Sequence, residues 1–264
     1  MKTNSWLVVL SILIMLLVWQ LVASLGGFPA FILPSPEIVG LRFAQAIADG
    51  SLARNTAVTL GEVLAGLVLG VSVATVLGYL LARSLKLERL LSPYIVASQS
   101  IPIVAIAPLL VIWFGPGLFS KILVCALIVF FPVLVNTVVG VRSVPEDLRD
   151  LMRSLQATRW QTLRFLELPA ALPVFLGGLR IGATLSVIGA VVGEFVGAKS
   201  GLGFLVNVGR GIYDTSLVFV AVFTLIALAL ILYGSVSLVE KHLLKWQQQE
   251  IKVLLNSDLG AKTG

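Results

Sequence analysis

Few side chains in this sequence are of a kind that could carry out catalysis or bind a metal. The 264 residues include one cysteine, Cys125, and one histidine, His242. A single cysteine excludes a disulfide framework and a cysteine zinc cluster, and a single histidine excludes multi-histidine metal sites and histidine-based triads. The phosphate-binding motif G-x-x-x-x-G-K-[ST] is absent from the sequence, so the chain should not hydrolyse ATP. We therefore expect no enzyme activity, no metal and no cofactor in this polypeptide.

A second group of polar residues interrupts stretches that are otherwise apolar. Ionisable side chains inside a membrane are costly and mark functional sites by default, as at Glu62 and Glu194. Each of these two lies near the end of its stretch, where it could instead reach the interface or a helix end. A proline at position 102 leaves a backbone carbonyl group of the preceding turn without its hydrogen-bond donor. Inside a membrane, such a carbonyl is tolerated only where protein or a water-filled cavity satisfies it. The kink at Pro102 therefore either serves helix packing or lines a pathway. With Gln99 and Asn136, these residues are our candidates for a translocation pathway.

The composition identifies the solvent around these residues. Hydrophobic residues make up 58% of the chain and charged residues 12%, about half the usual share near 25%. A water-soluble protein of this size cannot cover its surface with so few charges, so the lipid bilayer must surround most of it. The net charge of +6 is then explained by basic loops on the cytoplasmic side, and we expect no nucleic-acid partner.

Six stretches are long and apolar enough to cross a bilayer, which takes roughly 20 residues of helix. The third contains several prolines and is interpreted as one broken span. The first has too long an apolar core for a signal peptide, and no clear A-x-A cleavage site follows it. The sequence thus predicts an all-α membrane protein with six transmembrane helices, and residues 1–264 form one domain. The predicted spans are residues 6–25, 58–82, 92–114, 121–141, 169–197 and 215–239.

The distribution of basic residues predicts the orientation. With the N-terminus inside, the cytoplasmic segments contain 13 of the 19 lysines and arginines, among them Lys2, Lys252 and Lys262. The outer segments contain 5, and Arg180 lies within the fifth span. Because positive loops stay on the cytoplasmic side, both termini are expected in the cytoplasm.

Two spans carry small residues at about every fourth position. Helices in a bilayer associate by close packing over such residues, because lipid is as apolar as leucine. We expect these stripes to pack within the helix bundle rather than to form a dedicated dimer face. The stripes are Gly66, Gly70, Ala74 and Gly78 in the second span, and Gly178, Gly182, Gly189, Gly193 and Gly197 in the fifth.

The cytoplasmic connection of residues 143–168 has the pattern of a folded helix–turn–helix elbow. Ser143 and Glu146 have the spacing of a capping box, and Thr158 and Gln161 repeat it before a second short helix that should end before Pro169. Apolar residues at i, i+3, i+4 and i+7 give the first helix one apolar stripe. The elbow either lies on the lipid headgroups or docks on a cytoplasmic protein.

The residues from Asp150 to Pro169 resemble the EAA loop of ABC-importer permeases, whose pattern is E-A-A-x3-G-x9-I-x-L-P. Asp150 stands in the glutamate position, Leu151 and Met152 replace the alanines, and Gln156 replaces the glycine. Other blocks agree with this family, closest to its nitrate, sulfonate and taurine branch, which also contains permeases for thiamine precursors and riboflavin. They are L-P-S-P at 33–36, W-F-G at 113–115, F-P-V-L-V-N-T at 131–137 and S-G-L-G at 200–203.

The resemblance implies a type I ABC importer permease in the inner (plasma) membrane. It implies a cytosolic ATPase dimer that binds ATP and magnesium, an extracytoplasmic solute-binding protein and a second copy of the permease. A glycine at the elbow suits a left-handed helix end, and Gln156 there should cost about 1 kcal/mol. The residues expected to couple to the ATPase are Asp150, Leu151, Met152, Arg153, Leu155, Gln156, Arg159 and Trp160.

The sequence favours a neutral or cationic solute, because the spans contain Glu62 and Glu194 but no cluster of basic residues. A heterocyclic vitamin or pyrimidine precursor, such as riboflavin or a thiamine precursor, is the first candidate, ahead of sulfonate, taurine or nitrate. The alternative is a proton-coupled secondary transporter that uses one of the two glutamates as its proton carrier.

The elbow gives a first prediction. A charged side chain in place of Leu151 or Leu155 should abolish co-purification of the ATPase, because it would have to be desolvated at an apolar contact. Membrane insertion should be unchanged. Retained co-purification would refute a docking role for the elbow.

Overall fold

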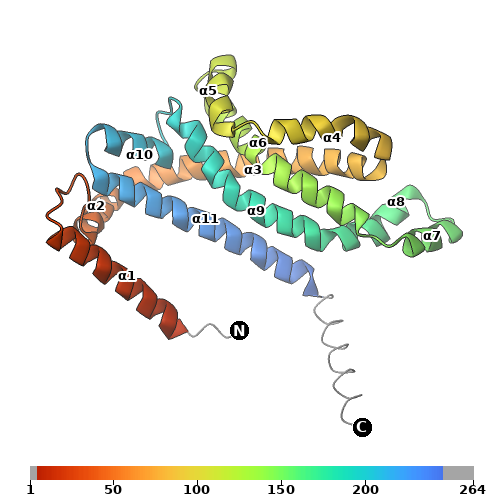
Figure 1. The fold of residues 1–264 in the computed structure, drawn as a ribbon, viewed down its shortest axis with the longest axis horizontal. Coiled ribbons are helices and arrows are strands. Elements are labelled where there is room, and N and C mark those ends of the chain that lie inside the picture. Colours follow the sequence, from red (N-terminus) through yellow and green to blue (C-terminus); the bar gives the residue numbers. More distant parts are fainter. Residues whose placement is uncertain (1–4, 246–264) are drawn as a thin grey trace, which may run out of the picture.

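The computed structural model describes residues 5–245, and every regular element in that range is helical (Figure 1). The residues Lys2, Lys252 and Lys262, which contribute to the predicted orientation, lie outside it. The elements are α1 (Ser5–Leu25), α2 (Pro36–Ala48), α3 (Ser51–Arg83), α4 (Leu85–Gln99), α5 (Ile103–Phe114), α6 (Leu118–Arg142), α7 (Glu146–Ser154), α8 (Arg159–Thr162), a π-helical turn (Leu163–Glu167), α9 (Leu168–Phe195), α10 (Leu202–Gly211) and α11 (Thr215–Leu243).

Five helical segments of the described chain are long and apolar enough to cross a membrane, and a sixth crossing is made if α4 and α5 form one broken span. The axes of α4 and α5 differ by 95°. The break falls at Pro102, which precedes α5 in an extended conformation, whereas Pro108 lies inside α5. Proline is tolerated at the start of a helix because the residue there makes no intrahelical N–H hydrogen bond that could be lost. The chain therefore bends before α5, where the ring of Pro102 can be accommodated.

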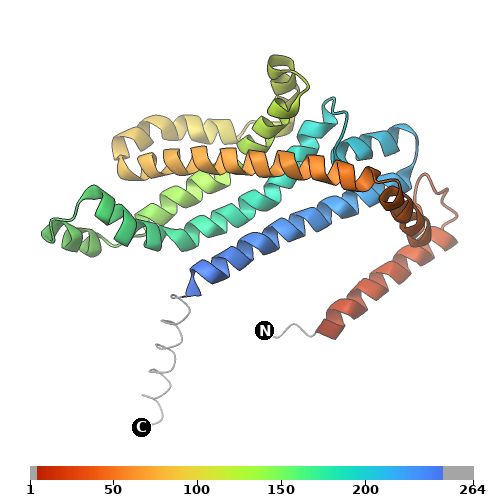
Figure 2. The same cartoon turned by 180° about the vertical axis from the view of Figure 1, so that it is seen from behind.

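The centre of the molecule is α6, with α3 and α9 packed along it (Figure 2). The two glycine stripes face this helix, except at Gly197, which lies beyond the end of α9 and has no such contact. A Cβ atom added at Gly70 would lie 2.6 Å from the carbonyl oxygen of Ala126, and one at Gly189 would lie 2.8 Å from Cα of Cys125. The small residues therefore bring three backbones together, as close packing in lipid requires. The single cysteine is buried at this crossing.

The first helix lies at the edge of the molecule (Figure 1). Its side chains are mostly exposed, and it contacts the bundle near its C-terminal end. There the Trp19 ring stacks on Phe219 with centroids 5.2 Å apart, and its indole N–H donates to the carbonyl oxygen of Pro34 at 3.1 Å. The N-terminal span is thus pinned at one end, and most of its surface is left for lipid or another chain.

The sequence did not predict α10, a ten-residue helix between α9 and α11. The ion pair between Arg42 of α2 and Asp214, 2.8 Å apart, joins two further segments at the same end of the molecule. Asp214 also accepts a hydrogen bond from the backbone N–H of Leu217 at 3.0 Å and so caps α11. The connections at this end of the molecule are therefore ordered by a helix cap and an ion pair.

The packing of α9 on α6 gives a second prediction. A Cβ atom at Gly178 would lie 2.5 Å from Cβ of Asn136, whereas one at the adjacent Gly177 meets nothing within 4 Å. Gly178→Ala should therefore cost on the order of 1–3 kcal/mol and lower the thermal unfolding midpoint of the purified protein. Gly177→Ala is the matched control and should leave the midpoint unchanged or raise it, because alanine favours helix. Equal midpoints for the two variants would contradict this packing.

Candidate functional site

The elbow of residues 143–168 projects from one end of the bundle as α7 and α8 (Figure 1). The predicted capping box at Ser143 is wrong. The hydroxyl of Ser143 donates to the carbonyl oxygen of Gly140 at 2.8 Å, and Pro145 precedes the first residue of α7. The chain turns sharply after α6, so Ser143 belongs to the end of that helix and cannot cap the next one.

The turn of the elbow has the left-handed residue expected at Gln156, whose φ is 53°. The backbone N–H of Ala157 donates to the carbonyl oxygen of Met152 at 3.0 Å, and that of Gln156 donates to Arg153 at 2.9 Å. These two bonds form a Schellman motif, which satisfies carbonyl groups at the end of α7. The motif thus forms with glutamine where glycine would be unstrained.

The second predicted capping box is present. The backbone N–H of Gln161 donates to the hydroxyl of Thr158 at 3.3 Å, and the backbone N–H of Thr158 donates to the side chain of Gln161 at 2.7 Å. The helix does not end before Pro169, however, and runs on from Arg159 to Phe195. The π-helical turn bonds Leu168 to Leu163, one residue farther back than in an α-helix, which makes room for the proline ring. The second helix of the elbow and the fifth span are therefore one continuous rod.

The apolar residues of the elbow face away from the bundle. Leu151, Leu155 and Trp160 are 53%, 68% and 67% exposed, and Met152 is partly exposed. Large exposed apolar side chains grouped at one site indicate an interaction surface. Among the charged candidates, Asp150 and Arg153 form an exposed ion pair at 2.6 Å, and Arg159 is exposed. The arrangement suits a docking surface, and the coupling role of these residues stays a prediction.

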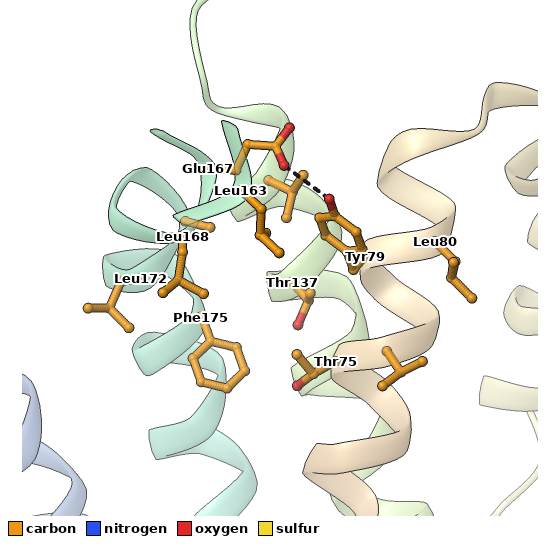
Figure 3. Close-up of a pocket in the computed structure, with 12 residues that line it drawn as sticks. Thr75, Tyr79, Leu80, Thr137, Leu163, Glu167, Leu168, Leu172 and Phe175 are labelled. Atoms are coloured by element: carbon orange, nitrogen blue, oxygen red, sulfur yellow. Dashed lines mark hydrogen bonds between the residues drawn. The ribbon is translucent and has the colours of Figure 1, made fainter. Parts of the chain in front are cut away.

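A buried acid that the sequence analysis missed holds the base of the elbow. Glu167 is 1% exposed and accepts a hydrogen bond from the Tyr79 hydroxyl at 3.2 Å (Figure 3). It also pairs with Arg83 at 3.1 Å. The Arg83 guanidinium also lies over the Tyr79 ring and donates to its hydroxyl at 3.0 Å. Tyr79 and Arg83 are four residues apart near the end of the second span, a spacing that could have signalled a shared partner. The contact ties the elbow to α3.

An apolar groove lies beside this contact, between α3 and α9 with α6 as its floor (Figure 3). Its volume is about 440 Å³, which is within the range of small-molecule sites. Thr75 and Glu167 are among its few polar residues. The other lining residues are Val76, Tyr79, Leu80, Thr137, Val141, Leu163, Leu168, Ala171, Leu172 and Phe175.

At the other end of the bundle, the two candidate glutamates belong to a buried polar cluster. Glu62 of α3 accepts a hydrogen bond from Lys121 of α6 at 2.7 Å, and Glu62 is fully buried. Lys121 is the first residue of the fourth predicted span and one of the five cations assigned to the outer segments, but the packing places it 7% exposed beside this acid. Burial of both charges requires such pairing.

Glu194 is also fully buried and holds the start of α10. Its carboxylate accepts hydrogen bonds from the Thr59 hydroxyl at 2.6 Å and from the backbone N–H of Gly203. The N–H of Leu202 donates in turn to the Thr59 hydroxyl at 2.8 Å, and Asn55 accepts from Gly201 at 2.7 Å. This cluster gives the block S-G-L-G at 200–203 a physical role, because a side chain at Gly201 would occupy the place of the carboxylate.

The remaining pathway candidates lie apart from this cluster. Gln99 is exposed and lines a small cavity of about 170 Å³ between α4 and α6, and Pro102 is exposed at the break after α4. Asn136 donates to the carbonyl oxygen of Pro132 at 2.8 Å and packs against Gly178. Within one chain, the five candidates therefore do not converge on one cavity, and their pathway role stays a prediction. No cluster of three potential metal ligands occurs between residues 5 and 245.

Residues 74–245 match the family model described as the binding-protein-dependent transport system inner membrane component. The chain belongs to this family. The permease is 49% identical over 237 residues to the riboflavin transport system permease protein RibX of Chloroflexus aurantiacus, covering 90% of this chain and 88% of the relative. It is 34% identical to the formylaminopyrimidine transport permease protein ThiX of Halalkalibacterium halodurans, covering 90% and 94%. It is 32% identical to the putative aliphatic sulfonates transport permease protein SsuC of Bacillus subtilis, covering 89% and 85%.

Solved structures agree with the fold. A chain of the MetNI methionine ABC transporter in an inward-facing conformation matches with a TM-score of 0.66 at 22% identity, covering 73% of the permease and 96% of that chain. A chain of an amino acid ABC transporter crystallised with histidines matches with a TM-score of 0.60 at 18% identity, covering 75% and 97%. The predicted all-α membrane architecture and the type I importer fold are thus confirmed. The permease is an inner-membrane subunit of an ABC importer.

The buried ion pair gives a third prediction. Lys121→Met leaves Glu62 as an uncompensated buried charge, which should cost roughly 3–5 kcal/mol of stability. The double variant Glu62→Gln with Lys121→Met should regain most of that loss, and Lys86→Met, at an exposed lysine, serves as the control. Unfolding of the purified permease measures all three. Equal stability of the single and double variants would contradict the pairing.

Proposed function

We propose that the permease imports a neutral heterocyclic vitamin of the riboflavin class, with energy supplied by a separate ATPase. The observation that carries this proposal is the 49% identity with a riboflavin permease over 90% of the chain, against 32–34% for the pyrimidine and sulfonate permeases described above. A thiamine precursor is the next candidate, followed by a sulfonate, taurine or nitrate.

The charges inside the bundle support a solute without negative charge. Acidic partners neutralise two basic residues of the described spans, one in the first turn of α6 and one within α9. Lys121 pairs with Glu62, and Arg180 of α9 pairs with Glu240 of α11. Arg180 also lies over the Tyr233 ring, 5.3 Å from its centroid. Neither cation is available to bind a sulfonate or nitrate, because each is already neutralised by its neighbour.

The elbow supports coupling to an ATPase dimer in the cytoplasm. An apolar docking surface on a continuous helix transmits a displacement at one end as a tilt of the other, because a helix bends little over its length. The rod from Arg159 to Phe195 has this form, and the Glu167 contact passes the displacement on to α3. The exposed arginines of the elbow favour its placement on the cytoplasmic side, with both termini there.

The complete importer then contains two copies of the permease and an extracytoplasmic solute-binding protein. A second copy encloses a pathway that one chain does not, since the candidate residues of one chain do not converge. The binding protein meets the opposite end, where α2, α10 and their connections lie. A proton-coupled mechanism would need an accessible carboxyl group, and both Glu62 and Glu194 are fully buried and bonded.

The transport proposal gives a fourth prediction. Inverted vesicles are the wrong orientation for import, so right-side-out vesicles that contain the permease and its partner subunits are loaded with ATP and supplied with labelled riboflavin. Uptake should depend on ATP and continue when an uncoupler collapses the proton gradient. A tenfold excess of unlabelled riboflavin should compete, and the same excess of taurine should not.

Leu155→Asp is the matched negative variant, because it keeps the spans intact and removes the docking surface. Its vesicles should bind no ATPase and take up no riboflavin. Competition by taurine alone would assign the permease to the sulfonate branch. Uptake that follows the proton gradient without ATP would support the secondary transporter instead.

A further inference from the structure

A second cavity at the base of the elbow is lined by an excess of positive charge. It has a volume of about 310 Å³ and lies between the end of α3 and the elbow. Glu167 is the acidic residue of its lining, together with four arginines, two alanines and a threonine. These lining residues are Ala82, Arg83, Arg149, Arg153, Ala157, Arg159, Thr162 and Glu167.

The arginines of this cavity differ in their partners. Arg83 pairs with Glu167, and Arg153 pairs with Asp150. Within the described part of the chain, no carboxylate lies within ion-pair distance of Arg149 or Arg159, so these two carry the excess charge. The guanidinium of Arg149 is held in place by a hydrogen bond to the carbonyl oxygen of Val141 at 2.7 Å, and its Nε is buried without a partner there. The cavity is thus built to receive an anion.

The basic cavity meets the apolar groove between α3 and α9, because Glu167 lines both. Figure 3 shows the Tyr79–Glu167 hydrogen bond at one end of the groove, with Thr75 and Phe175 deeper along the helices. The groove extends along the spans, and the cavity lies at the end where the loops carry their arginines. One molecule with an anionic head and an apolar tail would fill both.

A third feature concerns the boundary between the two cavities. Glu167 Oε1 is buried and has no hydrogen-bond partner among residues 5–245. A buried acceptor without a donor is costly, so a ligand that brings a hydroxyl group to this point would be favoured. The headgroup of phosphatidylglycerol carries such hydroxyl groups next to its phosphate.

From these features we infer that the joined cavities bind one anionic phospholipid of the cytoplasmic leaflet. The phosphate lies among Arg149, Arg153 and Arg159, and an acyl chain lies in the groove against Val76, Leu80 and Phe175. Basic pockets beside membrane spans bind such headgroups. The inference rests on the proposed cytoplasmic position of the elbow. The lipid would bridge α3 and the elbow, the two segments that the Glu167 contact joins. It would thereby stabilise the position of the helix from Arg159 to Phe195 against α3.

The test measures lipid binding to the purified full-length permease by native mass spectrometry, without ATPase or solute. Dioleoyl phosphatidylglycerol should bind at least about tenfold more tightly than dioleoyl phosphatidylcholine. Both lipids carry a phosphate, but the choline ammonium cancels its charge in phosphatidylcholine, so only phosphatidylglycerol brings a net negative charge to the arginines. The double variant Arg153→Gln, Arg159→Gln should lose this preference. The double variant Arg54→Gln, Arg210→Gln removes the same charge from exposed positions at the other end and should keep it.

A second pair of variants tests the groove. Val76→Phe narrows it and should weaken binding of both lipids severalfold, whereas Val68→Phe, at a similarly exposed position of α3 outside the groove, should not. Glycerol phosphate at millimolar concentration supplies the headgroup without the chains and should not displace phosphatidylglycerol. Displacement by it would identify a free-phosphate site and overturn the lipid assignment.

Equal binding of the two lipids would overturn the proposal, as would an unchanged preference in the Arg153/Arg159 variant. If the ATPase covers these arginines and the isolated permease binds no phosphatidylglycerol, the lipid proposal is overturned in favour of an acidic protein partner. Loss of phosphatidylglycerol whenever two copies associate would assign the groove to the second copy. Failure here leaves ATP-driven riboflavin uptake unaffected, because binding is measured without transport, so the two proposals fail separately.

Discussion

The structure depends on the close approach of α3 and α9 to α6. In water, the burial of apolar surface would drive these helices together, but lipid is as apolar as the side chains it surrounds. Attraction must therefore come from dispersion between backbones that touch, and dispersion falls steeply with distance. The glycine stripes permit this contact, and the small side chain of Cys125 lies at the crossing where both stripes converge. A bundle built in this way tolerates little added volume along the α6 seam.

Close packing also decides where charges can lie. A charged group enclosed by tightly packed helices has no water to solvate it, so it must find its counter-charge on a neighbouring helix. Lys121 and Glu62 meet across the α3–α6 contact, Glu167 and Arg83 meet across the α9–α3 contact, and Arg180 and Glu240 meet across the α9–α11 contact. Each pair fixes the rotation of one helix relative to another, a task that dispersion between smooth apolar surfaces performs poorly.

The same constraints shape the end of the molecule that carries the elbow. The π-helical turn before Pro169 keeps α8 and the fifth span in one helix, and the Glu167 contact fastens that helix to α3. At the opposite end, Glu194 accepts a hydrogen bond from the backbone N–H of Gly203 at the start of α10, so the loop after the fifth span is held by the span itself. This one helix therefore connects the elbow end of the molecule with the end that carries α10.

The sequence by itself determined the solvent, the approximate positions of the spans, the packing stripes, the elbow and its left-handed turn at Gln156. These are local properties, because hydropathy over 20 residues, spacing along a helix and turn chemistry do not depend on distant partners. It misplaced the start of α7 and the end of the helix after Thr158, since each depends on how the chain turns beside another helix. It also missed α10, the Glu167 contact and the pairing of Lys121 with Glu62. Only the tertiary structure decided these contacts. The paired residues lie 59 or 88 positions apart in the chain, and they meet only when the helices pack with a particular rotation and a particular shift along their axes.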